Sequence, residues 1–255
     1  MAKQTQGYAR WLNQAALLLS VPLLLVAWQY VSVSGVVNRI LFPPPTEVTV
    51  ALYQAVRDGT LIRDVLASLN RVLVGYVTGA AAGIVVGLLT GRYALISNLL
   101  TPIFQLLRPI PPIAFVPIVV LWFGLTEFGK YFLVFWGVFF TVWIAAHYGV
   151  QKVDPMLLRA ARSLGTSERN LLVYVMFPAA VPYIFVGLRT SVSISFYTLV
   201  GAELAGAFAG LAYRIELAQQ NMQTAQVMGG LVMLGVISAL ADRTFNFLAR
   251  RFVWW

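Results

Sequence analysis

The chain has 255 residues, of which 60% are hydrophobic and 11% are charged. Soluble proteins have roughly 45–50% apolar and about 25% charged residues, so these few charges could not cover a soluble surface. The composition excludes a soluble enzyme, and the lack of cysteine excludes disulfides and thiolate metal sites. The net charge of +9 is typical of a membrane protein with basic cytoplasmic loops, and nucleic-acid binding is not expected.

Six segments are apolar enough to form membrane-spanning helices, each of which needs about 20 residues. In chain order they cover residues 12–33, 72–91, 94–124, 131–150, 178–202 and 226–247. The third segment is interrupted by Arg108 and by five prolines. We therefore expect an all-α fold, a polytopic membrane bundle of about six transmembrane helices.

The basic residues predict how these spans are oriented. With both termini inside, the inner segments carry ten Lys and Arg, the outer segments six and the spans two. Cytoplasmic segments are enriched in Lys and Arg, so we predict that both termini are cytoplasmic. The expected parts are an N-terminal transmembrane helix (1–38), an extracytoplasmic strut with an amphipathic helix (39–70) and a core transmembrane domain (71–255). The core includes a cytoplasmic loop at 151–177.

The segment between the first two spans is expected to be extended and then helical. Three consecutive prolines at 43–45 exclude a helix interior and favour an extended strut. Thr46 can cap a helix that follows. Four apolar residues of that helix then share one face: Val48, Leu52, Ala55 and Val56. We expect this amphipathic helix to lie on the outer membrane surface.

The second span carries a regular series of glycines. They recur every four residues: Gly75, Gly79, Gly83, Gly87 and Gly91. Four residues are slightly more than one helical turn, so these glycines form a gently winding groove. Small residues at this spacing allow another helix to approach closely. We predict tight helix packing here, with a partner helix in this chain or in another.

No residue pattern predicts catalysis or metal binding. The stretch Gly124–Tyr131 nearly matches a phosphate-binding loop, but Tyr131 stands where a hydroxyl would hold magnesium, and no strand precedes it. His147 is the only histidine, so no histidine cluster can bind a metal. We expect a non-catalytic protein with no metal or nucleotide site of its own.

Charged residues inside spans are candidates for a translocation path. Arg189 lies eleven residues after Pro178, which places it roughly 16 Å along a helix and near the membrane midplane. A central arginine costs about 2.5–3.5 kcal/mol on insertion scales, so it should face a partner or a water-filled path. We favour an ion pair with a carboxylate or bonds to free carbonyls over solute binding. Arg108 offers the same alternatives, and Glu203 can face the path or a subunit contact.

The loop between the fourth and fifth spans predicts a helical hairpin. Asp154 and Pro155 form a strong helix start, with Asp at the N-cap and Pro at the first helical position. Gly165 ends this helix after about ten residues, and Thr166 or Ser167 can cap a second helix. The first helix is largely apolar and too short to span a membrane. It can enter a groove of a partner protein or pack back on its own bundle.

This loop resembles the EAA loop of permeases from binding-protein-dependent ABC importers. The similar residues are Arg159–Gly165, with the sequence RAARSLG, and Phe177–Ala180, with the sequence FPAA. Four further stretches resemble the nitrate, sulfonate and taurine branch of that family: Phe42–Pro45, Leu107–Pro112, Leu121–Gly124 and Ala202–Leu204. The resemblance covers roughly residues 40 to 250 and implies a fold like that of type I ABC importer permeases.

The resemblance implies that the first loop helix is a coupling helix that docks on a separate ATP-hydrolysing subunit. The implied docking residues are Pro155, Leu158, Arg159, Ala160, Ala161, Leu164 and Gly165. Arg159 stands where the family usually has glutamate, so the ion pair expected of that glutamate is absent.

The resemblance also implies the assembly and its location in a bacterial cytoplasmic (inner) membrane. Two copies of the chain would surround the path, and two cytoplasmic subunits would bind ATP and magnesium. An extracytoplasmic binding protein would deliver a small, anionic solute related to sulfonate, taurine or nitrate.

Two other functions remain open from the residues alone. A self-sufficient channel or secondary transporter usually has an internal repeat with a broken helix in each half, and only one proline-broken span is present. A membrane-embedded enzyme needs acids or histidines clustered at one depth, whereas the nine acids are scattered.

Overall fold

A computed structural model describes residues 19–252, and within that range every regular element is a helix. The described residues form two compact units. One contains the chain up to Leu61 together with Ile215–Val232, and the other contains Ile62–Arg214 together with the chain from Met233. This division by contacts is separate from the three parts expected from the sequence, which remain predictions.

The smaller unit begins with the apolar helix Leu19–Val33, while residues 12–18 of the first expected span lie outside the described residues. The Trp28 indole nitrogen donates to the Pro43 carbonyl (3.1 Å). Pro44 is extended (φ −69°, ψ 154°), as expected. Pro45 was expected in the same extended segment but is the first residue of α2, Pro45–Arg57. The prediction that Thr46 caps this helix was wrong. Proline at the first helical position supplies the fixed φ that a helix start needs, so Thr46 lies one position inside the helix.

The apolar face of α2 is covered only in part. Val48 is buried, and Leu52 lies against Gly229 of α11, Thr224–Phe252. Val56, expected on the same face, is 47% exposed.

Within residues 19–252, four helical stretches are long and apolar enough to cross a membrane. They are α3 (Thr60–Arg92), α6 (Glu127–Gln151), the continuous stretch Glu168–Leu204 and α11. The stretch Glu168–Leu204 contains α8 (Glu168–Asn170), the π-helix η2 (Leu171–Met176) and α9 (Phe177–Leu204). These stretches confirm the second, fourth, fifth and sixth expected spans.

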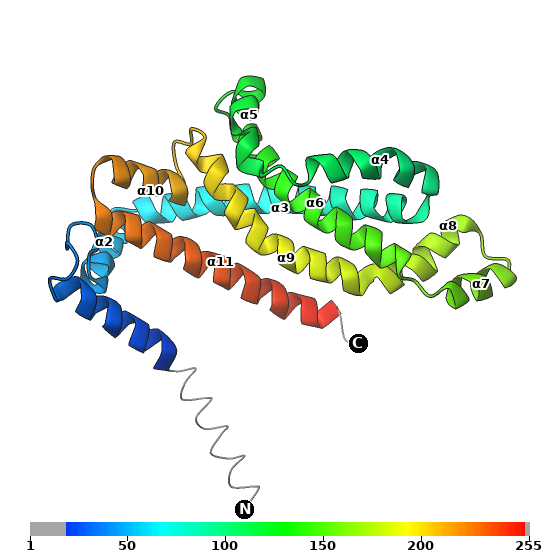
Figure 1. Cartoon of the computed structure of the whole chain (residues 1–255), viewed down its shortest axis with the longest axis horizontal. Helices are drawn as coiled ribbons and strands as arrows, with labels where there is room; N and C mark the ends of the chain where they lie inside the picture. The colour runs from blue at the N-terminus through cyan, green and yellow to red at the C-terminus, as the bar shows by residue number, and fades with distance from the viewer. Residues whose placement is uncertain (1–18, 253–255) are drawn as a thin grey trace, which may run out of the picture. The chain divides into compact units, whose positions relative to one another are not determined.

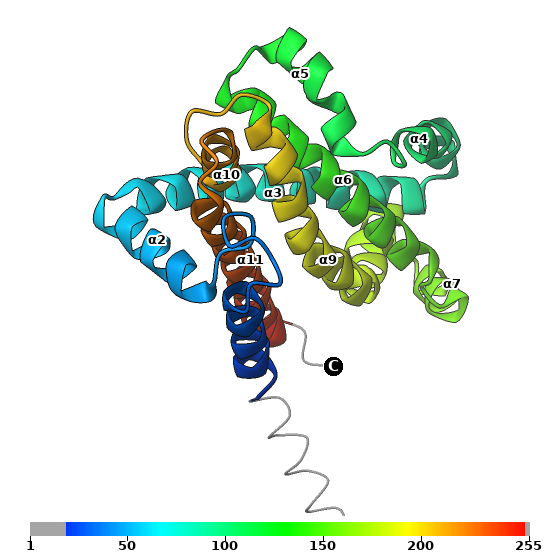
Figure 2. The ribbon, with the colours of Figure 1, turned by 60° about the vertical axis from the view of Figure 1, so that its left-hand side comes forward.

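The third expected span is a broken one. It consists of α4 (Ala94–Leu107), the 3₁₀-helix η1 (Pro112–Phe115) and α5 (Val116–Phe123), with a bend of 88° between the two halves. Figure 2 shows α5 turning away from the direction of α4. Three of the four residues 109–112 are prolines. Because proline has no backbone N–H to donate, a helix cannot continue through them.

The core of the larger unit lies where α3, α6 and α9 pack together. Figures 1 and 2 show α6 and α9 side by side. Val138 and Val142 of α6 pack with Val192 and Phe196 of α9 and with Ala80 of α3. Four residues of α11 also pack against this cluster: Leu234, Ile237, Ala241 and Phe245.

The glycine face of α3 lies directly against α6 of the same chain. A methyl group built at Gly79 would be 2.8 Å from the Phe135 carbonyl oxygen, and one at Gly83 would be 2.8 Å from that of Phe139. Gly75, Gly87 and Gly91 meet α6 in the same way. The two backbones are therefore in contact with no layer of side chains between them.

Candidate coupling and translocation sites

The loop after α6 forms the expected short helix, α7, over Pro155–Ser163. An Asp154 carboxylate oxygen accepts from the Met156 amide (2.8 Å), as an N-cap should. Gly165 has φ +75°, and its amide donates to the Arg162 carbonyl (2.9 Å). A residue with positive φ at this position ends a helix, and glycine adopts it without strain. The predicted start and stop are thus confirmed, and Ser167 caps α8 (3.4 Å to the Asn170 amide).

The two faces of α7 differ in what covers them. Leu158 and Ala161 pack against a buried cluster that includes Leu171. Elsewhere on this helix, Met156 is 68% and Leu157 53% exposed, and Leu164 at the C-cap is 86% exposed. The other expected docking residues are also exposed: Pro155, Arg159, Ala160 and Gly165. One side of α7 therefore packs back on its own bundle, whereas docking of the exposed side on a partner protein stays a prediction.

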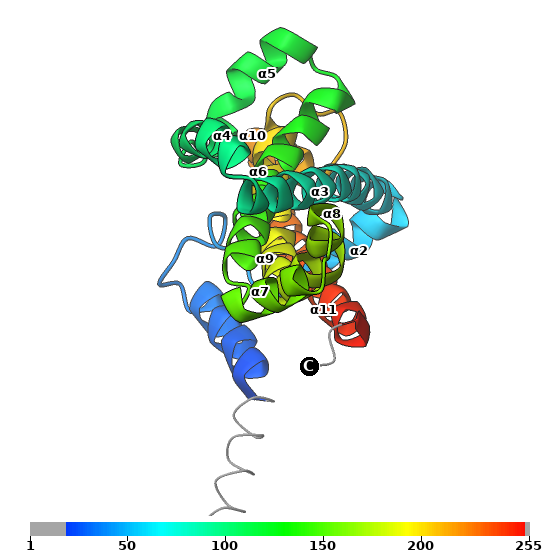
Figure 3. The ribbon, with the colours of Figure 1, turned by 90° about the vertical axis from the view of Figure 1, so that its right-hand side faces the viewer.

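Ion pairs join this loop to the end of α3. The Glu168 carboxylate contacts the Arg92 guanidinium and lies 3.5 Å from Nε of Arg162. Figure 3 faces this end of the larger unit and shows α7 and α8 there, with the C-terminal end of α11. Glu168 therefore links Arg162 of α7 to Arg92 at the end of α3.

The opposite end of the larger unit holds a buried network centred on Arg71. This guanidinium lies 2.9 Å from Glu203 Oε1 and 2.7 Å from Glu127 Oε2. It also donates to the Ala209 carbonyl (2.6 Å). Lys130 adds a further contact to Glu127 (2.9 Å). The arginine of α3 thus joins α6, α9 and the loop after α9.

Two carboxylates fix the loop between α9 and α10, Leu211–Gln220. Glu203 is fully buried, and its oxygens accept from the Ser68 hydroxyl (2.6 Å) and the Ala212 amide (2.8 Å). Asp64, also fully buried, accepts from the Gly210 amide (3.0 Å) and pairs with Arg214 (2.8 Å). The Glu203 carboxylate is thus buried and already bonded to groups of the protein. Its role in the path stays a prediction.

Sequence reasoning missed Arg71 and Asp64 as parts of this network. Both lie in the first half of α3, ahead of the residues that were expected to span the membrane, and were assigned to an outer loop. A helical reading of residues 60–92 places Asp64, Ser68 and Arg71 at i, i+4 and i+7 on one face. That spacing was the available signal.

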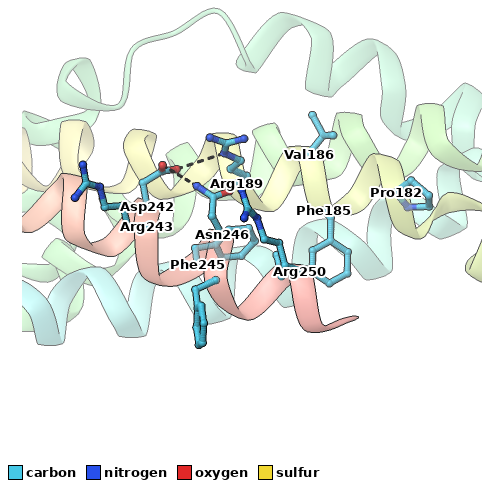
Figure 4. Close-up of a pocket in the computed structure, with 11 residues that line it drawn as sticks. Pro182, Phe185, Val186, Arg189, Asp242, Arg243, Phe245, Asn246 and Arg250 are labelled. Carbon is cyan, nitrogen blue, oxygen red and sulfur yellow. Dashed lines mark hydrogen bonds and ion pairs between the residues drawn. The ribbon is translucent and has the colours of Figure 1, made fainter. Parts of the chain in front are cut away.

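Arg189 lies beside a carboxylate, as favoured from the sequence. Its Nε is 3.5 Å from an Asp242 oxygen, and the Asn246 amide donates to the same aspartate (2.8 Å). Figure 4 shows this pair in a cavity between α9 and α11, which Arg243 and Arg250 also line. A role for Arg189 in the path stays a prediction.

Arg108 lines a different cavity, where the broken span meets α6 and α9. Its volume is about 380 Å³, and its polar lining comes from Arg108, Thr141, Tyr197 and Thr198. Trp136 also lines it, and its indole N–H is buried with no hydrogen-bond partner among the described residues. No carboxylate in the described part of the chain pairs with Arg108. The cavity therefore offers a cation that has no carboxylate partner.

A bundle of membrane-crossing helices, with one broken span and a helical loop that is apolar and uncovered, is the architecture of a transporter's transmembrane subunit. Residues 79–253 match the family model described as "Binding-protein-dependent transport system inner membrane component". The chain belongs to this family and is a multi-pass permease subunit of an ABC importer.

Curated relatives agree over nearly the whole chain. The taurine transport system permease protein TauC of Escherichia coli (strain K12) is 34% identical, with 96% of this chain and 92% of that protein covered. The putative aliphatic sulfonates transport permease protein SsuC of Bacillus subtilis (strain 168) is 33% identical, with 93% and 86% covered. The nitrate import permease protein NrtB of Synechocystis is 32% identical, with 90% and 86% covered.

A solved structure confirms the expected fold. The chain is similar to one in an inward-facing structure of the MetNI methionine ABC transporter (TM-score 0.65, 18% identity), with 76% of this chain and 96% of that chain covered. At this identity the likeness concerns the fold alone.

Proposed function

We propose that two copies of this chain form the path of an ATP-driven importer for a small anion. Two separate subunits bind ATP and magnesium and dock on the α7 loops. This docking takes place in the cytoplasm, and both termini of the permease lie on the same side. An extracytoplasmic binding protein delivers the solute at the opposite end. The membrane is the bacterial cytoplasmic (inner) membrane. The observation that carries this proposal is the uncovered apolar face of α7.

An exposed apolar surface on a short loop helix calls for a partner. Met156, Leu157 and Leu164 are more than half exposed, although α7 lies in a loop that is too polar to enter lipid, with Arg159 and Arg162 also exposed. Short amphipathic helices of this kind bind in apolar grooves of other proteins. The end of the helix is fixed by Asp154 and Gly165, so the helix is already formed before it docks. A preformed helix reduces the ordering cost of binding.

The solute class follows from the cavity at Arg108 and from the names of the relatives. Those names refer to taurine, aliphatic sulfonates and nitrate, which share a sulfonate or nitrate group with delocalised negative charge. An intramembrane arginine is costly unless it meets an anion or water. Arg108 supplies the charge at this cavity, and the side chains of Thr141, Tyr197 and Thr198 supply the rest of its polar lining. We therefore propose that Arg108 contacts the solute on the path.

Adding two acids to the exposed face of α7 is expected to prevent docking. In Met156→Asp/Leu157→Asp, two anchors of the interface become charged, and loss of one anchor typically costs about 2 kcal/mol or roughly 30-fold in affinity. Co-purification with the ATP-binding subunit should fall by at least that factor. The matched control Gln219→Asp/Gln220→Asp places two acids on exposed positions of α10 and should co-purify normally. Equal assembly of both variants would contradict docking on α7.

Removal of the charge at Arg108 is expected to weaken solute handling without changing assembly. A hydrogen bond to a charged group contributes about 1.5–3 kcal/mol, so Arg108→Gln should raise the KM for transport roughly 10-fold or more, whereas Arg108→Lys should retain part of the affinity. Uptake into vesicles that contain permease, ATP-binding subunit and binding protein measures this. Arg57→Gln, on the exposed end of α2, is the control. An unchanged KM in Arg108→Gln would show that Arg108 does not contact the solute on the path.

A further inference from the structure

The second cavity of the larger unit lies between α9 and the C-terminal half of α11. Its volume is about 810 Å³. One side of the lining is apolar and includes Phe185, Phe245 and Phe247. The polar part of the lining has three arginines, one aspartate and one asparagine: Arg189, Arg243, Arg250, Asp242 and Asn246. The cavity therefore combines an aromatic wall with a surplus of positive charge.

Only one of the three arginines has a carboxylate partner among the described residues. Asp242 pairs with Arg189 (3.5 Å) and accepts from Asn246 (2.8 Å). Arg243 and Arg250 have no ion pair within residues 19–252, and both are exposed. Figure 4 shows the Arg250 side chain reaching toward Asn246, on the same side as Arg189. Two guanidinium groups are thus available to an anion.

We propose that this cavity binds an anionic phospholipid, with the headgroup phosphate on Arg243 and Arg250 and an acyl chain along the aromatic wall. This assignment rests on the proposed function for the orientation, because the C-terminal end of α11 lies at the same end of the larger unit as α7 (Figure 3). That end then faces the cytoplasm. Arg250 lies in the last turn of α11, at the depth of the inner headgroups.

The spacing of the two arginines fits a lipid that reaches into the bilayer. Seven residues separate Arg243 from Arg250, which is two turns and roughly 10 Å along the helix. Long arginine side chains extend toward the headgroup region from such depths. Basic pockets between transmembrane helices on the cytoplasmic side are typical sites for anionic headgroups.

The apolar wall distinguishes a lipid from a free anion. A soluble phosphate or sulfonate would gain nothing from Phe185 or Phe245, whereas an acyl chain would bury them. The apolar wall continues onto an exposed apolar surface of α11, where Phe247 is 73% and Leu248 52% exposed. Only 11% of the apolar window of α11 is buried. A lipid can therefore enter the cavity from the side.

Spin-labelled lipids test this site on the purified full-length chain in phosphatidylcholine nanodiscs. Phosphatidylglycerol with a labelled acyl chain should be immobilised in preference to labelled phosphatidylcholine. Arg243→Gln/Arg250→Gln should lower the apparent affinity by roughly fivefold for each arginine, the effect of one basic residue near an anionic surface. Arg243→Lys/Arg250→Lys keeps the charge and should retain most of the binding, which also shows that variants at these positions fold.

The matched control is Arg251→Gln, compared with the single variant Arg250→Gln. Arg251 is the exposed neighbour of Arg250 and does not line the cavity, so its removal should leave the affinity nearly unchanged. Equal weakening by both single variants would show general surface attraction and overturn the site. Equal binding of the two lipids, or no loss in Arg243→Gln/Arg250→Gln, would overturn it as well.

Competition with inorganic phosphate shows whether the site binds a lipid headgroup or a free anion. Millimolar phosphate in the buffer should leave labelled phosphatidylglycerol bound, because phosphate has no acyl chain. Full displacement by phosphate would show a site for a free anion and overturn the lipid assignment. The result is independent of transport: lipid binding can fail while Arg108-dependent uptake persists, or persist while uptake fails.

Discussion

Replacement of Glu203 by alanine is expected to cost about 3–5 kcal/mol of unfolding free energy, the usual effect of removing one partner of a buried ion pair. Glu203 is fully buried, and its loss leaves the Ser68 hydroxyl and the Ala212 amide without an acceptor. In this variant the Arg71 guanidinium still contacts the carboxylate of Glu127, whose side chain is half-exposed. Denaturant unfolding of the purified permease in mixed micelles measures the change.

Two further variants define the cause of that loss. Glu203→Gln keeps the shape and one acceptor oxygen but not the charge, so it should lose less stability than Glu203→Ala. Glu47→Ala removes an exposed ion pair with Arg39 and should cost at most about 1 kcal/mol. If Glu203→Ala were as mild as Glu47→Ala, the network would not hold the loop before α10.

Replacement of Gly83 by leucine is expected to prevent α3 and α6 from packing. A Cβ atom at Gly83 would lie 2.8 Å from the Phe139 carbonyl oxygen and 3.0 Å from the Trp143 nitrogen. These are backbone atoms and cannot rotate away, so the helices must separate. Overpacking costs about 1–3 kcal/mol where side chains can adjust, and we expect at least about 3 kcal/mol here. The yield of folded, monodisperse protein should fall steeply.

The control for this substitution is Gly235→Leu on α11. A Cβ atom at Gly235 has nothing within 4 Å, so the same change should be tolerated. Gly83→Ala should have an intermediate effect, because it adds only the one clashing carbon. Normal yield of Gly83→Leu would show that α3 and α6 are not in backbone contact.

Local chemistry predicted the elements whose ends depend on single residues. Asp154 and Gly165 determine α7 because a cap and a positive φ act within one turn. The prolines after Leu107 determine the break before α5 for the same reason. The expected span boundaries were less accurate, since they assumed that a membrane helix begins where charges stop.

The start of α3 shows why hydropathy alone failed. The helix begins at Thr60, twelve residues before the expected span at 72, and includes the charged residues Asp64 and Arg71. Both are buried because partners from α6, α9 and α10 meet them. Those partners are up to 150 residues away in sequence, and the sequence does not show which of them will meet. The same limit applies to Glu203, whose partners Ser68, Arg71 and Ala212 cannot be identified from its position in a span.

The direct contact of α3 with α6 makes these two helices a rigid pair. Gly91 meets Val150 near the end that carries α7, and Arg71 joins Glu127 of α6 near the other end. Arg71 also holds the Ala209 carbonyl. Because no layer of side chains lies along the joint, we expect the two helices to tilt together, so that a tilt at the α7 end also moves the loop after α9. If an ATP-binding subunit docks on α7, as we propose, its movement would thereby reach the loop at the opposite end of the permease.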